Sequence, residues 1–369
     1  NRKGPGALAA VLNRPGVTLS PEVAQVGMNR AGSAANKSPA LVKAFQKVGK
    51  VKPMKLQLSA AEMNAMMIRV AEKGNPVRGE RIYRSVGLQC VVCHAIGGAG
   101  GVIGPDLVSM GSSAPVDYLV ESLLEPSKKL KEGYHTAVVA TKAGDIYAGA
   151  VAREDVREVV IRDATGKETR VPKSQIASKS MSPVSLMPMG LTAKLREDEF
   201  VDLVRFLSEL GKEGAYKTTA NRFVRTWEVL QPHPRTPDAL GHYGSKFFAD
   251  DFKESKWTAM VSKVNGGLPT DELPRVKGRG RSSYGVARFS LNLAKAGTIS
   301  FKLTGNLKDL DLFVSDKEIK LPDDKESVTI EVDRPAGRSK VTVIGLLGTE
   351  LGELSVELLG DAGAFRLVR

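Results

Sequence analysis

Four short amphipathic stretches open the chain, and their apolar residues recur at the spacing of one helical face. Three of them begin at a serine cap, Ser20, Ser38 and Ser59, and the last cap is followed by Glu62 in a capping box. The expected helices cover residues 5–12, 21–29, 39–48 and 60–70. We therefore predict that residues 1–73 form a helical segment, of the kind that ends a helical-repeat region.

Residues 74–211 combine helical and strand-like patterns. Asn75 followed by Pro76 predicts the start of a helix, and residues 197–207 have the apolar spacing of a later one. Segments typical of strands lie between these helices, separated by turn sequences, at 136–141, 146–152, 156–163 and 168–172. They predict a small antiparallel β insertion at about 135–178.

Short alternating segments also fill the end of the chain. They recur from residue 287 onward between turns rich in glycine and aspartate, which indicates a β-sandwich over 241–369. A proline-rich stretch at 231–237 marks residues 212–240 as a linker before it. A chain of 369 residues exceeds the usual size of one hydrophobic core, which agrees with a division into several domains.

Charge is spread unevenly along the chain. The net charge is +13, and residues 1–75 alone hold twelve Lys or Arg against three Asp or Glu. Aromatic residues make up 5%, and no basic stretch interleaves with aromatic residues as in a nucleic-acid platform, so we expect no nucleic-acid partner. A basic segment of this kind faces an acidic partner or solvent. No apolar stretch reaches the length of a transmembrane segment.

The only two cysteines lie in Cys90-Val91-Val92-Cys93-His94. Such a pair can form a redox disulfide, half of a zinc site or a haem attachment site. A zinc site needs four ligands, whereas the other histidines are isolated, and a thioredoxin-like dithiol would follow a strand rather than a helix-like stretch. Haem attachment accounts for the whole motif, because two thiols on one helical turn bind the vinyl groups and the adjacent histidine ligates the iron. We therefore expect one covalent haem c on Cys90 and Cys93, with His94 as an axial ligand.

The loop at 182–191 is the best candidate segment to supply the second axial ligand. Two prolines and a glycine prevent a helix there, and the loop holds Met187 and Met189 shortly before the last predicted helix. Met or His completes the ligand set of many such haems. We expect Met187 to bind the iron, with Met189 as the runner-up. A separate glycine-rich segment lies at 97–104, directly after the cysteine motif. Its glycines would let the backbone pass close to a flat cofactor. The segment is not preceded by a strand, which argues against a loop that binds a dinucleotide.

Residues 74–211 also carry an ordered set of short motifs that match a known family. They are Gly79, Tyr83, Cys90-x-x-Cys93-His94, Ile-Gly-Pro-Asp-Leu at 103–107, Glu-Ser-Leu-Leu-Glu-Pro-Ser at 121–127, Gly133-Tyr134, Ser-Leu-Met-Pro at 185–188 and the closing helix at 197–207. With these motifs the segment resembles the haem-binding domain of the planctomycete/Verrucomicrobium-type c-type cytochromes, a variant of the class I cytochrome c fold. The resemblance implies that Met187 is the axial methionine and Pro105 the proline beside the proximal histidine. Met189 departs from the family, which usually has an acidic residue there.

The resemblance completes the expected fold. Class I cytochromes cross their first and last helices at a small and an aromatic residue, so we expect Gly79 to face Phe206. The expected fold class is multi-domain α+β. It comprises an N-terminal helical segment, a class I cytochrome c-like α domain with a small antiparallel β insertion, and a C-terminal β-sandwich.

A six-coordinate haem with His and Met ligands leaves no place for a substrate, which favours electron transfer over catalysis. The resemblance implies a redox partner protein or a fused dehydrogenase domain, and a periplasmic or otherwise exported location. The alternative is a haem-based redox or gas sensor, or a peroxidase-like enzyme, with an exchangeable sixth ligand. A third hypothesis is a β-sandwich that binds carbohydrate or a partner through Trp227, Tyr243 or Trp257, with the haem as an accessory. Tryptophan in a small β domain is more often a core residue.

Overall fold

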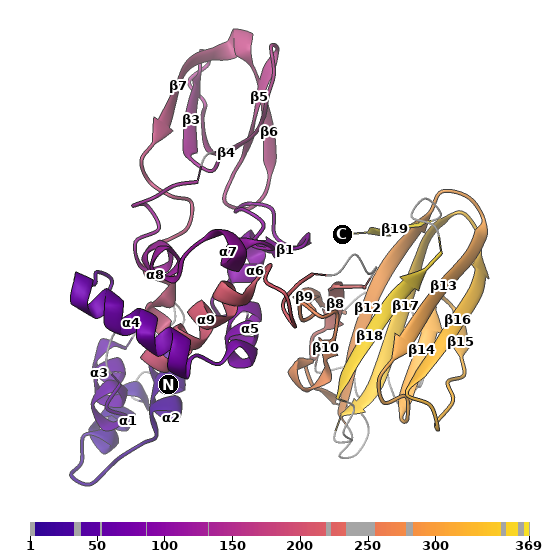
Figure 1. The fold of residues 1–369 in the computed structure, drawn as a ribbon, viewed down its shortest axis with the longest axis horizontal. Helices are drawn as coiled ribbons and strands as arrows, with labels where there is room; N and C mark the ends of the chain where they lie inside the picture. The colour runs from indigo at the N-terminus through magenta and orange to yellow at the C-terminus, as the bar shows by residue number, and fades with distance from the viewer. Residues whose placement is uncertain are drawn as a thin grey trace. The chain divides into compact units, whose positions relative to one another are not determined.

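The computed structural model divides the chain into two compact units, residues 1–212 and residues 213–369 (Figure 1). The structure describes residues 4–32, 38–51, 54–85, 87–131, 133–218, 223–233, 255–277, 283–347, 352–360 and 365–368. The first unit combines helices with antiparallel strands, and the second consists mainly of antiparallel sheets. The chain is thus a mixed α and β protein with a β-rich C-terminal part.

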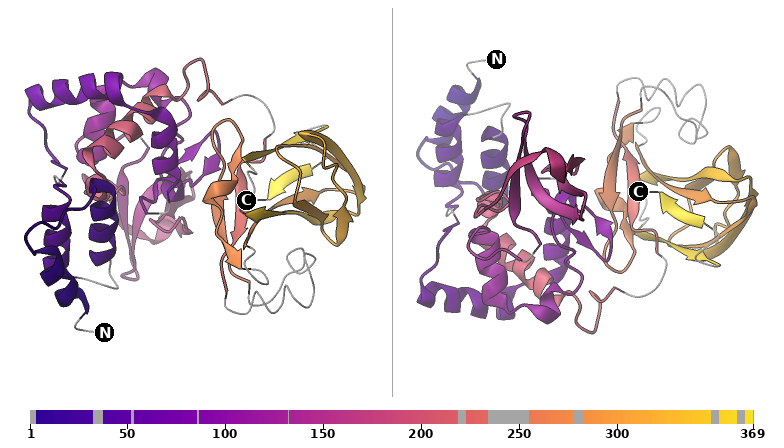
Figure 2. Two further views of the ribbon diagram at one scale, coloured as in Figure 1. Left: turned by 90° about the horizontal axis from the view of Figure 1, so that it is seen from below. Right: turned by 90° about the horizontal axis from the view of Figure 1, so that it is seen from above.

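Three short helices lie side by side near the N-terminus: α1 (Gly4–Leu12), α2 (Pro21–Ala31) and α3 (Pro39–Val48) (Figure 2). The Ser20 hydroxyl accepts a hydrogen bond from the Val23 amide and caps α2 as predicted. Apolar residues on the facing sides of the three helices form a small core. Helix α4 (Ala60–Lys73) begins at the predicted capping box of Ser59 and Glu62 and runs three residues beyond its expected end.

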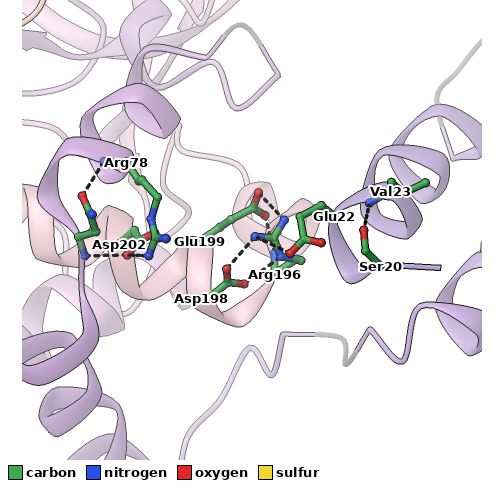
Figure 3. Close-up of polar contacts among 9 residues, drawn as sticks. Ser20, Glu22, Val23, Arg78, Arg196, Asp198, Glu199 and Asp202 are labelled. Carbon is green, nitrogen blue, oxygen red and sulfur yellow. Dashed lines mark hydrogen bonds and ion pairs between the residues drawn. The ribbon is translucent and has the colours of Figure 1, made fainter. Parts of the chain in front are cut away.

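A cluster of charges joins the N-terminal helices to helix α9 (Glu197–Glu209) (Figure 3). Arg196 precedes α9, and its guanidinium pairs with Asp198 at 2.7 Å and with Glu199 at 3.0 Å. The same guanidinium lies 3.8 Å from the carboxylate of Glu22 on α2. Because Glu22 is 62% exposed, this last pair adds little stability. The contact shows that α2 lies close to the N-terminal end of α9.

Helices α5 (Pro76–Arg84) and α9 cross at close range. A Cβ atom built on Gly79 would lie 2.0 Å from the Asp202 carbonyl oxygen and 2.7 Å from the Phe206 Cβ, so this approach requires glycine. The Tyr83 ring packs on the Phe206 ring with centroids 5.7 Å apart. The expectation that Gly79 faces Phe206 is confirmed.

We expect Gly79→Ala to destabilise the first unit by about 1–3 kcal/mol, because the added methyl group would overlap the backbone of α9. Gly6→Ala is the matched control, since Gly6 also lies in a helix and a Cβ there would meet nothing within 4 Å. Urea unfolding followed by circular dichroism measures the free energy of both variants. Equal stability of the two variants would show that the crossing accommodates a side chain.

Shorter helices and one pair of short strands complete the first unit apart from the β insertion. They are α6 (Cys90–Cys93), β1 (Ala95–Ile96), β2 (Ala99–Gly100), α7 (Met110–Ser113), α8 (Val116–Leu124) and the 3-10 helix η2 (Leu191–Lys194). Strands β1 and β2 pair with each other directly after the cysteine motif. Among the helices that the structure describes, none has both the length and the apolar character needed to cross a lipid bilayer.

The predicted β insertion forms a five-stranded antiparallel sheet in the order β6-β5-β4-β3-β7. Its elements are β3 (Thr136–Thr141), β4 (Ile146–Glu154), β5 (Glu158–Arg162), β6 (Glu168–Pro172), the 3-10 helix η1 (Lys173–Gln175) and β7 (Ile176–Ser182). The sheet continues past the expected end at 178, because β7 pairs with β3 as far as Ser182, opposite Thr136. Buried Val139, Val159 and Ile161 lie in its core.

The second unit contains two antiparallel sheets that share one core. The smaller sheet has the order β10-β18-β13-β16, and the larger has the order β15-β14-β17-β12-β8-β9, with β11 and β19 also paired to β12. The elements are β8 (Thr226–Leu230), β9 (Trp257–Val261), β10 (Leu268–Pro269), η3 (Thr270–Glu272), β11 (Val276–Lys277), β12 (Ser283–Leu293), β13 (Gly297–Thr304), β14 (Leu310–Val314), β15 (Lys317–Ile319), β16 (Ser327–Arg334), β17 (Gly337–Leu347), β18 (Glu353–Leu359) and β19 (Phe365–Val368). Phe289 contacts both Trp227 and Phe301 edge to face within this core.

The linker expected over 212–240 contains a strand of the second unit. Strand β8 pairs with β12 and β9, and its Trp227 is 1% exposed. The proline-rich stretch that directly follows β8 indicated a linker, whereas the strand partner β12 lies far along the chain. Trp227 is therefore a core residue and not a surface contact for carbohydrate. Residues 234–240 of the expected linker, and Tyr243, lie outside the described residues.

Candidate functional site

Both cysteines lie on a single turn of helix. In α6 the His94 amide donates to the Cys90 carbonyl at 2.8 Å, which closes the turn around Cys93. Gln89 precedes the helix with a φ of 61°, a left-handed conformation that redirects the chain into the turn. Neither thiol is in a disulfide. The motif therefore offers two free thiols and an imidazole within five consecutive residues.

The two thiols are neutral near pH 7. Burial raises the pKa of the Cys90 thiol to about 11, and burial also raises the pKa of the Cys93 thiol. A redox-active cysteine instead has a lowered pKa, because the thiolate is the nucleophile. This environment disfavours a thioredoxin-like dithiol.

One nitrogen of His94 is held by the protein. Its Nδ1 lies 2.9 Å from the Pro105 carbonyl oxygen. Because a carbonyl oxygen only accepts, Nδ1 carries the proton and Nε2 keeps its lone pair. Burial lowers the pKa of His94, which favours the neutral ring. The imidazole is thus in the tautomer that an iron ligand needs, and Pro105 lies beside the histidine as the resemblance implies.

The glycine-rich segment after the motif packs directly on it. A Cβ atom on Gly104 would lie 2.5 Å from Cε1 of His94, and a Cβ atom on Gly101 would lie 1.8 Å from the Val92 carbonyl oxygen. The Gly104 amide donates to the Cys93 carbonyl at 2.8 Å. These two glycines therefore allow the loop to fit against the motif and the imidazole. The sequence had indicated only a close approach to a cofactor.

Two residues outside the predicted ligand set also hold this region together. Asp106 accepts hydrogen bonds from three loop amides, those of Gly97, Gly98 and Val108. The Tyr83 hydroxyl donates to the His94 carbonyl at 2.9 Å. Tyr83 and Asp106 both belong to the family motifs, but an aspartate beside a proline is a common turn residue and a tyrosine on an apolar helix face is a common core residue, so the motifs did not reveal these two roles.

The predicted sixth-ligand residues lie on a second loop, between β7 and η2. The Ser185 amide donates to the Ser127 hydroxyl at 3.1 Å, and the Met187 amide donates to the Ser185 hydroxyl at 3.1 Å. Met187 is half-buried, whereas Met189 is 63% exposed. The structure thus brings Cys90, Cys93, His94 and Pro105 together and places both methionines on a separate, anchored loop. Of the two methionines, Met187 has the more sheltered side chain.

The chemistry of these residues fits a c-type haem. Two neutral thiols on one helical turn match the two vinyl groups, and an imidazole with a free Nε2 lone pair matches an axial iron site. Cys90 and Cys93 would hold the group covalently, and His94 would ligate its iron. Within the described ranges, no cluster of three or more His, Cys, Asp or Glu side chains is arranged to hold a metal ion by itself.

Comparisons with known proteins add little to this geometry. No family model and no curated protein matches the chain. Among solved structures, a family 35 carbohydrate-binding module from an environmental isolate is 17% identical, with 28% of this chain and 87% of that chain covered and a TM-score of 0.19. A β-glucosidase from Kluyveromyces marxianus is 14% identical, with 42% of this chain and 19% of that chain covered and a TM-score of 0.23. Similarities at these scores say nothing about the cysteine motif.

Proposed function

We propose that this chain transfers electrons through a single covalently attached c-type haem. The observation that carries the proposal is the hydrogen bond from His94 Nδ1 to the Pro105 carbonyl, next to two thiols on one helical turn. In this proposal residues 74–211 are a class I cytochrome c-like domain of the planctomycete/Verrucomicrobium type. The described sheets of the second unit then form its C-terminal β-sandwich.

Each residue of the site has a distinct role in this proposal. Cys90 and Cys93 tether the haem, and His94 ligates the iron through Nε2. The Pro105 carbonyl accepts a hydrogen bond from His94 Nδ1, which orients the ring and increases its donor strength toward the iron. Met187 provides the sixth ligand, and a thioether in this position raises the reduction potential. The bound haem would supply a one-electron couple between ferric and ferrous iron.

Packing around His94 suits electron transfer. The glycine-rich loop packs on the His94 ring and the Tyr83 hydroxyl donates to the His94 carbonyl, so His94 has little freedom to move when the charge on the iron changes. Two protein ligands would fill both axial positions and leave none for a substrate. Met187 as a second axial ligand would therefore favour an electron carrier over a sensor or a peroxidase-like enzyme.

We further propose that the electrons pass to or from a redox partner protein or a fused dehydrogenase domain. The excess of Lys and Arg in residues 1–75 would favour an acidic surface on such a partner. The proposed location is periplasmic or otherwise exported, in keeping with the cytochrome resemblance.

The test of this function is the visible spectrum of the purified protein, oxidised and reduced, with and without carbon monoxide. We expect a low-spin six-coordinate haem that carbon monoxide leaves unchanged, because two side chains fill the axial positions. We also expect the haem to remain attached after denaturation, and to be lost from a Cys90→Ser, Cys93→Ser double variant.

Other spectra would contradict the electron-carrier proposal. A five-coordinate haem, or one that binds carbon monoxide in the wild-type protein, would favour a gas or redox sensor or a peroxidase-like enzyme. A wild-type protein with no covalent haem would remove the proposed function. A double cysteine variant that keeps its haem after denaturation would show that the attachment lies elsewhere.

A further inference from the structure

The β insertion has two arms that reach two different loops (Figure 1). Strands β5 and β6 form the first arm, and β3 and β7 form the second, with β4 between them. The pairing of β4 with β5 shifts register between Val151 and Arg153, and such a bulge bends a strand. One sheet can therefore contact both the loop that orients His94 and the loop that carries Met187.

The first arm is anchored to the loop of His94 by Arg162, at the end of β5. The Arg162 Nη1 donates to the Val102 carbonyl at 2.8 Å. Its Nε and Nη2 both donate to one Glu168 carboxylate oxygen, at 3.1 Å and 2.6 Å, which holds the planar guanidinium in one orientation. The Arg162 side chain is only 24% exposed. Val102 lies three residues before Pro105, so the anchor acts on the segment that fixes the His94 ring.

The second arm is anchored to the methionine loop by Thr136, at the start of β3. The Thr136 hydroxyl donates to the Val184 carbonyl at 2.8 Å, and Thr136 itself is 9% exposed. Thr136 also pairs with Ser182 in the sheet, so two successive contacts guide the chain out of β7. Val184 lies three residues before Met187. This anchor therefore acts on the predicted sixth ligand from within the same sheet.

We propose that the β insertion is a brace that holds the two axial-ligand loops in fixed positions, with Arg162 and Thr136 as its positioning residues. This inference rests on the proposed haem function. A rigid connection between the loops keeps Met187 in place when the iron changes its charge, and so keeps exogenous ligands out. Neither residue contacts the haem in this proposal, since each one acts through a backbone carbonyl.

Hydrogen–deuterium exchange and imidazole titration of the whole protein test the brace. We expect Arg162→Ala to speed amide exchange in residues 101–108 and Thr136→Val to speed it in residues 183–190. Each change should be about fivefold, the equilibrium effect of one ordinary hydrogen bond. Both variants should bind exogenous imidazole at the iron about fivefold more tightly, because Met187 is displaced more easily. Arg153→Ala is the matched control, since Arg153 is on the same sheet but pairs with Glu158 and Asp155.

The outcomes separate this inference from the proposed function. Unchanged exchange in both loops would overturn the brace, even in a protein that holds its haem. Faster exchange with unchanged imidazole affinity would also overturn it, because the insertion would then support the fold without positioning the ligands. Equal effects of the Arg153 variant would show general loosening of the sheet and contradict specific anchors. A wild-type protein without haem would overturn the proposed function and, with it, any role in positioning ligands.

Discussion

Met187→Ala is expected to abolish the methionine-to-iron charge-transfer band of the oxidised protein and to make the reduced protein bind carbon monoxide. Alanine has no donor atom, so the sixth position would pass to water or stand open. The reduction potential should fall by a substantial part of the roughly 0.8 V that axial ligands span. Absorption spectra and a potentiometric titration measure these changes, while covalent attachment through Cys90 and Cys93 should be unaffected.

Met189→Ala is the matched control, two residues away on the same loop. Its side chain is 63% exposed, whereas Met187 is half-buried, so we expect its spectrum and potential to match the wild-type protein. Loss of the charge-transfer band only in Met189→Ala would transfer the ligand role to Met189. A band that survives in both variants would exclude both methionines as the sixth ligand.

The parts of the site that could be predicted from the sequence depend on local contacts. Cys90, Cys93 and His94 lie within five residues, so a single helical turn and its C-cap can present all three, as α6 does. The same holds for the helix starts at Ser20 and Ser59, where each serine hydroxyl accepts from an amide three residues later. Local hydrogen bonds of this kind leave a readable pattern of residue types.

Contacts between distant segments leave no such pattern. Arg162 reaches the Val102 carbonyl across sixty residues, and a carbonyl acceptor imposes no residue type on its own position. Strand β8 likewise pairs with β12, where Glu228 lies opposite Arg288, sixty residues further along the chain. The crossing of Gly79 and Phe206 is an exception, because close packing of two backbones demands glycine and the family motif includes it.

We expect Asp202→Ala to destabilise the first unit by about 3 kcal/mol, the largest stability loss among these variants. The Asp202 side chain is 2% exposed, and its carboxylate accepts from the Asn75 amide at 2.7 Å and from the Arg78 Nε at 2.7 Å (Figure 3). Alanine would leave the amide at the start of α5 without its partner and remove a charge-assisted bond. Urea unfolding measures the loss.

Comparison with other charge removals tests this explanation. Arg78→Ala should cost about 1–2 kcal/mol, because the Arg78 side chain is 60% exposed and the Asn75 amide still donates to the carboxylate. Glu209→Ala removes an ion pair to Arg205 from the same helix, and such surface pairs contribute about 0.3–0.5 kcal/mol. Similar losses in all three variants would mean that general charge balance, and not the buried carboxylate, stabilises the crossing. A loss confined to Asp202→Ala and Arg78→Ala would show that the ion pair between α5 and α9 stabilises the first unit. The same two helices hold Tyr83, which lies on α5, packs on Phe206 of α9 and donates to the His94 carbonyl.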